Sequence, residues 1–194
     1  PLYIAGLLLA ALCLSLTILR LLIFLSHQRF VEAGTFGVAC AGMITLIALV
    51  CIAAAYLTLP PNMGFADAAE YVMWGGGHVL QFANTALMLC GVYFLVRVTL
   101  GETPLPTAWF KAMMLLLVAG AAAGPLFYLT YPGGSATMRM TFTHIYWYAL
   151  PLPAGVVLLS VGALLARRWR DVWTGAPEVK AVADRITASN DQDG

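Results

Sequence analysis

The feature that most constrains this chain is a series of long apolar runs. A helix needs about 20 mostly apolar residues to cross the hydrocarbon core of a bilayer. Runs of this kind lie near residues 2–25, 35–59, 69–98, 108–128 and 141–166. Residues 60–62, 101–104 and 132–135, which include Pro, Gly and Asn, separate the later runs. The sequence therefore predicts an all-α, polytopic transmembrane bundle of about five spanning helices within residues 1–166.

The composition excludes an ordinary soluble domain. Hydrophobic residues make up 61% of the chain and charged residues only 10%, whereas a soluble domain carries roughly 25% charged residues. We therefore expect membrane lipid to contact most of the surface. The net charge of +1 gives no reason to expect nucleic acid as a partner. The four cysteines lie inside apolar runs without metal-type spacing, so we expect them to be small buried hydrophobic residues.

The distribution of basic residues predicts the orientation in the membrane. If the apolar runs cross one after another, six basic residues fall on one side: Arg29, Arg97, Lys111, Arg167, Arg168 and Arg170. The opposite loops carry Asp67, Glu70 and Arg139. Because basic residues concentrate on the cytoplasmic side, we expect the N-terminus outside. The polar tail, residues 167–194, is then cytoplasmic.

Two histidines are candidates for chemistry because imidazoles are costly inside hydrocarbon. His78 lies in the third apolar run and His144 at the start of the fifth, both toward the outer side. Two imidazoles at similar depth can share a metal or a haem, since neutral imidazole binds copper, zinc and iron. Alternatively, each histidine only forms a hydrogen bond to a neighbouring helix. His27 lies at the inner edge and is interpreted as an interfacial loop residue.

The residues around His78 strengthen this candidate. Helical spacing predicts one face, directed toward the bundle interior, that carries Trp74, His78, Gln81, Phe82 and Thr85. Gly75, Gly76 and Gly77 precede the histidine, and each weakens a helix by roughly 1 kcal/mol relative to Ala. Such a run is favourable where a large planar group or another backbone approaches closely.

These motifs resemble the catalytic subunit of the haem-copper oxidase and nitric oxide reductase superfamily. Trp74 and His78 have the spacing of the family's sixth helix, where the histidine binds the non-haem metal. Residues 143–147 and Pro151 are similar to the family's next ligand motif, a histidine pair followed by aromatic residues and a proline. Ile145 replaces the second histidine, and Phe82 stands where oxidases have tyrosine and nitric oxide reductases glutamate. The resemblance implies that the chain begins at the family's fourth helix, within a longer gene product.

The resemblance implies reduction of oxygen or nitric oxide at a centre of haem and a non-haem metal. His78 and His144 would bind the metal, copper or iron. Trp74, Gly76 and Phe82 would line the cofactor site, and Gln81 and Thr85 would supply catalytic hydrogen bonds. Haem b would have its ligands outside this chain. Cytochrome c or another electron-donor subunit would be the partner, in a bacterial inner membrane.

Two alternatives from other functional classes stay open. In a small b-type cytochrome, His78 and His144 would bind one haem axially and pass electrons only. In a non-catalytic membrane subunit, both histidines would be structural. The apolar runs carry no Asp, Glu or Lys at mid-membrane positions, which argues against an ion-coupled transporter.

Overall fold

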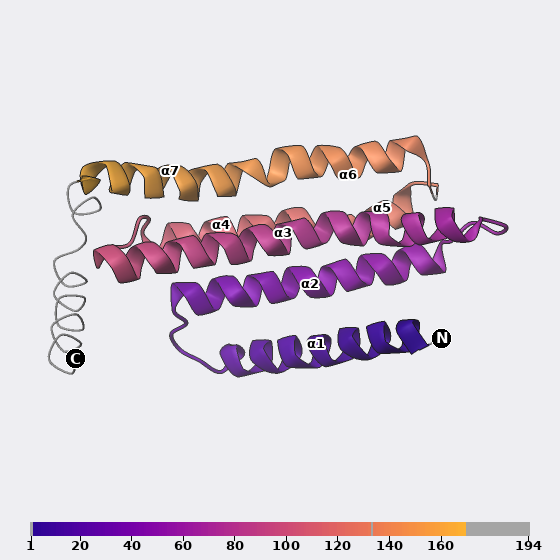
Figure 1. Cartoon of the computed structure of the whole chain (residues 1–194), viewed down its shortest axis with the longest axis horizontal. Helices are drawn as coiled ribbons and strands as arrows, with labels where there is room; N and C mark the ends of the chain where they lie inside the picture. The colour runs from indigo at the N-terminus through magenta and orange to yellow at the C-terminus, as the bar shows by residue number, and fades with distance from the viewer. Residues whose placement is uncertain (1, 133, 170–194) are drawn as a thin grey trace, which may run out of the picture.

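The chain folds into an antiparallel bundle of helices. The computed structural model describes residues 2–132 and 134–169. The regular elements of this part are α1 (Leu2–Ser26), α2 (Ala33–Leu57), α3 (Phe65–Leu100), α4 (Thr107–Ala122), α5 (Gly124–Thr130), α6 (Ala136–Ala149) and α7 (Pro151–Arg167). Figure 1 shows these helices running back and forth side by side along one axis. The predicted all-α helical bundle is confirmed.

In the part of the chain that the structure describes, five helical segments are long and apolar enough to cross a membrane. The first three are essentially α1, α2 and α3, whereas α4 joins α5 and α6 joins α7 to make the last two. Both junctions lie at prolines, Pro125 and Pro151, because proline lacks an N–H and its ring clashes with the carbonyl of the preceding turn. The prediction of single uninterrupted helices over residues 108–128 and 141–166 is wrong at these two breaks. The chain is an integral membrane protein.

The closest contact in the bundle joins α2 and α3 through small residues. A Cβ atom added at Gly37 of α2 would lie 2.2 Å from the Cys90 Sγ atom of α3. A Cβ atom added at Gly76 of α3 would lie 2.4 Å from Ile52 Cγ1 and 3.1 Å from the Ala48 carbonyl oxygen. Spanning helices associate mainly by such close packing. Lipid tails are as apolar as the helix surfaces, so the hydrophobic effect does not favour contact between helices. Gly76 therefore faces α2.

Helix α1 lies at the edge of the bundle (Figure 1) and packs lightly. Its contact with α2 centres on Ile18, whose Cγ2 atom would lie 2.9 Å from a Cβ atom added at Gly42. Cys13 of α1 is exposed, so the expectation that all four cysteines are buried is wrong for this residue. Cys40, Cys51 and Cys90 are buried in the core as expected, because they lie on helices packed on several sides.

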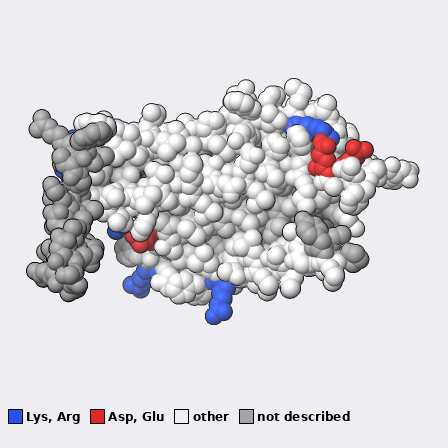
Figure 2. Space-filling view, in the orientation of Figure 1, with Lys and Arg blue, Asp and Glu red and all other residues white. Residues whose placement is uncertain are grey.

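Several charged side chains near the two ends of the bundle form ion pairs (Figure 2). One end of the bundle, at which α1 and α3 terminate, is called here the basic end. It has the ion pairs Glu32–Arg97 and Glu102–Arg168. At the same end, Lys111 Nζ donates to the Val31 carbonyl oxygen at 2.7 Å. The opposite end has Arg139 and Glu70, with their nitrogen and oxygen 2.9 Å apart. Exposed pairs contribute only about 0–1 kcal/mol each, so they mark the membrane edges rather than hold the bundle together. Of the predicted polar tail, residues 170–194 lie outside the described residues.

The α2–α3 contact predicts opposite effects for two neighbouring glycines. Gly76→Ala should lower the free energy of unfolding by about 1–3 kcal/mol, because its methyl group overlaps Ile52. Gly77→Ala is the matched control, since a Cβ atom there has nothing within 4 Å. It should leave stability unchanged or raise it by up to about 1 kcal/mol through better helix propensity. Denaturant unfolding of both variants in detergent micelles measures this difference, and equal effects of the two substitutions would contradict the packing.

Candidate functional site

His78 lies half-buried in a group of aromatic rings toward the end of the bundle that carries Glu70 and Arg139. This group, called here the His78 cluster, consists of Trp74, His78 and Phe82 of α3, Phe127 and Tyr128 of α5, and Phe142 and Tyr146 of α6. The ring centroid of His78 is 4.9 Å from that of Trp74, 6.2 Å from Phe142 and 6.3 Å from Tyr146. Contacts from both its own helix and α6 therefore hold the imidazole.

A hydrogen bond fixes which nitrogen of His78 carries a proton. The Nδ1 atom lies 2.8 Å from the carbonyl oxygen of Trp74. A carbonyl oxygen only accepts hydrogen bonds, so Nδ1 is the donor. In the singly protonated ring, Nε2 then has a free lone pair. Histidines that bind metals have this arrangement, with one ring nitrogen donating to a carbonyl or carboxylate and the other on the metal.

Trp74 has a charged neighbour on its ring and a polar atom without a partner. The Arg139 guanidinium carbon lies 5.1 Å from the Trp74 ring centroid, and Glu70 pairs with the same arginine. The Trp74 Nε1 atom is buried and has no hydrogen-bond acceptor within the described part of the chain. An unsatisfied buried donor costs about 1–3 kcal/mol. The cluster therefore has a donor available for a polar group.

His144 lies on a different side of α6 from the residues that contact His78. Phe142 and Tyr146 are one helical turn apart and both approach His78. His144 is two residues from each, which is about 200° around the helix, and its side chain is exposed. Its ring neighbour is Tyr148, at 6.1 Å between centroids. The structure does not bring the two imidazoles together, so it gives no support for a metal shared by His78 and His144.

The other predicted site residues divide between the interior and the surface. Phe82 is buried, with its ring centroid 6.5 Å from that of Tyr146. Thr85 is half-buried, and its hydroxyl donates to the Gln81 carbonyl oxygen at 2.9 Å. The Gln81 side chain is exposed, so the expectation that it faces the interior is wrong. Neighbouring helix positions point about 100° apart, and Phe82 takes the inward direction.

Sequence analysis missed the residues that surround His78 on the neighbouring helices. Phe142 and Tyr146 have the spacing of one helix face, and this pattern could have identified them. Gly75 leaves room for Phe142 and for Tyr128: an added Cβ atom would lie 2.4 Å from Tyr128 Oη and 2.6 Å from Phe142 Cζ. The Gly75 backbone N–H also lies 3.2 Å from Tyr128 Oη, to which it donates. Gly75 thus accommodates aromatic rings of α5 and α6, as Gly76 accommodates α2.

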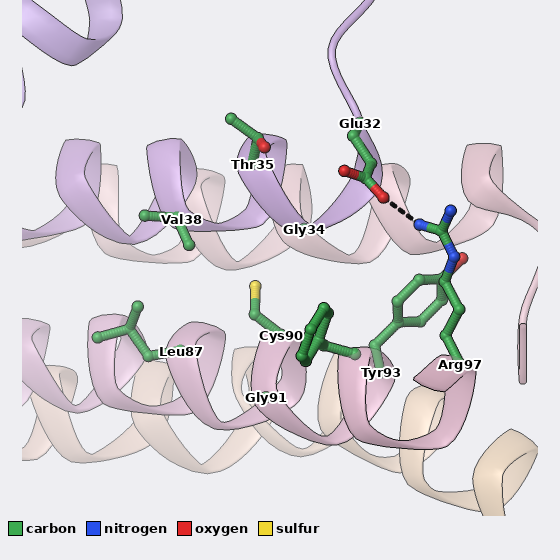
Figure 3. A pocket seen from close by; sticks show the side chains of 10 residues that line it. Glu32, Gly34, Thr35, Val38, Leu87, Cys90, Gly91, Tyr93 and Arg97 are labelled. Atoms are coloured by element: carbon green, nitrogen blue, oxygen red, sulfur yellow. Dashed lines mark hydrogen bonds and ion pairs between the residues drawn. The ribbon is translucent and has the colours of Figure 1, made fainter. Parts of the chain in front are cut away.

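A groove of about 380 Å³ lies elsewhere, between α2 and α3 toward the basic end. Its walls include Val38 and Leu87, and the Glu32–Arg97 pair lies at one end (Figure 3). Within residues 2–132 and 134–169, no three His, Cys, Asp or Glu side chains gather closely enough to hold a metal ion. A metal at the His78 cluster would therefore need ligands of other kinds, or ligands from outside these residues, to complete its coordination.

The Trp74 carbonyl contact predicts the protonation pattern of His78. We expect a proton on Nδ1 rather than on Nε2 alone, although free histidine prefers the opposite tautomer. Solid-state nitrogen NMR of protein labelled at histidine, with the His78 signals assigned by their loss in His78→Gln, measures this directly. Signals from a ring protonated only at Nε2 would contradict the hydrogen bond to Trp74.

Comparison of this chain with protein-family models, with curated proteins and with solved structures finds no match to any of them. Function must therefore be inferred from the His78 cluster and from the sequence motifs around it.

Proposed function

We propose that this chain is the membrane-embedded part of a haem-copper-type terminal reductase, with His78 as one ligand of the non-haem metal. The observation that carries the proposal is the fixed imidazole, whose Nδ1 donates to Trp74 and whose Nε2 keeps a free lone pair. The Trp74–His78 spacing, which resembles the family's metal-binding helix, supports the same role. The remaining metal ligands and those of haem b lie beyond the described residues in this proposal.

The residues of the His78 cluster suit the surroundings of such a metal. Trp74 orients the imidazole through its carbonyl oxygen, and its ring packs against the imidazole at an interplanar angle of 36°. Phe82 of α3 and Tyr146 of α6, whose rings contact each other edge to face, would limit the access of water to this metal. The unpaired Trp74 Nε1 can donate to a polar ligand. Copper or iron would bind and polarise oxygen or nitric oxide, and the haem would deliver electrons.

The proposed orientation places the basic end in the cytoplasm. Arg97, Lys111 and Arg168 lie at this end, and basic residues favour the cytoplasmic side. The His78 cluster would then lie in the outer half of a bacterial inner membrane. Cytochrome c or a donor subunit on the outer side would supply the electrons.

A second candidate is a non-catalytic membrane subunit. The observation that favours it is that the Trp74 carbonyl and ring already provide His78 with a polar partner and a packing surface. Buried polar groups in membranes need such partners whatever their role. A cytochrome with both histidines as axial ligands has less support, because His144 points away from His78.

Metal analysis and optical spectra of the full chain in its native membrane complex test the proposal. His78→Ala should lower the non-haem metal content and turnover at least tenfold, while the haem spectrum persists, since the haem ligands lie elsewhere. His144→Ala is the matched control and should keep the metal, because its side chain is exposed on another face of α6.

Retention of full metal content and turnover in His78→Ala would contradict the proposed ligand. A correctly inserted wild-type complex with neither metal nor haem would instead favour the non-catalytic subunit. Helical content and the amount of protein in the membrane serve as checks that both variants fold.

A further inference from the structure

One side of α3 is exposed along most of its length and has the spacing of a helix–helix contact. The residues of this side, called here the α3 seam, are all exposed: Gly77, Gln81, Asn84, Met88, Gly91, Leu95 and Val98. Their spacing alternates between four and three residues. This is the heptad spacing by which two helices interlock side chains along a left-handed crossing, which is also common in membrane bundles.

Two amides of the α3 seam lie near the middle of the membrane. Asn84 is midway along α3 between Glu70 and Arg97, whose ion pairs mark the two ends of the bundle. At 1.5 Å per residue, each end is about 20 Å away, so Asn84 and Gln81 lie well inside a hydrocarbon core about 30 Å thick. In Figure 1, α3 lies in front of α4, and none of the helices α1–α7 covers it on the viewer's side.

Lipid is an unfavourable environment for these two side chains. Neither side-chain amide has a hydrogen-bond partner within the described residues. At Gln81, it is the backbone carbonyl oxygen, not the side chain, that accepts a hydrogen bond from the Thr85 hydroxyl. Transfer of an amide from water to hydrocarbon costs about 4–8 kcal/mol when nothing there can pair with it. Asn and Gln side chains in spanning helices commonly form hydrogen bonds to another helix.

The surface beside the α3 seam is hollowed. Leu87 and the seam residue Gly91 line the groove between α2 and α3, opposite Gly34 and Val38 (Figure 3). Added Cβ atoms at Gly34, Gly77 and Gly91 would meet nothing within 4 Å among the described residues, so these glycines are not needed for packing there. Glycines at such positions let a second backbone approach closely.

We infer that the α3 seam is the contact surface of a symmetric dimer formed with a second copy of this chain. The primary amide is self-complementary, because it both donates and accepts hydrogen bonds. Two copies inserted in the same orientation are related by a two-fold axis along the membrane normal, which places Asn84 of each copy at the same depth. The amides then pair across the axis, and a single buried Asn can fix the register of such a helix pair.

Dimerisation of the full chain in lipid bilayers, measured by single-molecule photobleaching across a dilution series, tests the inference. Asn84→Leu should weaken dimerisation about three- to tenfold, as expected for the loss of one or two interhelical hydrogen bonds. Asn84→Gln keeps the amide and should restore most of the affinity. Thr17→Leu is the matched control, because it removes an exposed polar side chain from α1 and should have no effect.

Disulfide cross-linking locates the contact. In a Cys13→Ser background, Met88→Cys should form a disulfide-linked dimer, whereas Leu158→Cys on α7 should not. The two native side chains are comparably exposed, at 50% and 43%. A chain that stays monomeric at all protein densities would overturn the inference. The same holds if the chain is monomeric because a helix of another protein covers the seam. Equal cross-linking at both positions, or wild-type affinity in Asn84→Leu, would also overturn it.

Discussion

The close approach of α2 and α3 is the constraint on which the rest of the structure depends. It exists because Gly76 has no side chain where Ile52 and the Ala48 carbonyl oxygen pass, and because Gly37 leaves room for Cys90. In a bilayer, the hydrophobic effect does not distinguish a helix neighbour from lipid, so fit between surfaces decides which helices pair. This contact fixes the rotation of α3 about its own axis.

The rotation of α3 in turn assigns a direction to every residue around His78. Gly75 turns toward α5 and α6 and admits Tyr128 and Phe142, so His78 enters an aromatic cluster rather than lipid. The same rotation directs Gln81 and Asn84 outward. One helix thereby presents an oriented imidazole on one side and a pair of amides on another, and the two surfaces can serve different purposes.

Sequence analysis predicted the helices well because length and apolarity alone determine which segments span a membrane. It missed the breaks at Pro125 and Pro151, since each proline lies inside a run that stays apolar on both sides. It also failed for the direction of Gln81, and the structure does not bring His144 to His78. Apolar residues surround these positions on all faces, so hydropathy does not indicate which face meets protein, and packing between small residues decides it.

A double-mutant cycle between Gly76 and Ile52 tests the α2–α3 contact most directly. If the methyl group of Gly76→Ala overlaps Ile52, then Ile52→Ala should create the space that this methyl group needs. The account predicts that the double variant is more stable than the sum of the two single effects implies, by about 0.5–3 kcal/mol in unfolding free energy, as measured for other contacting pairs. Additive effects, with no coupling between the two positions, would contradict the contact that orients His78.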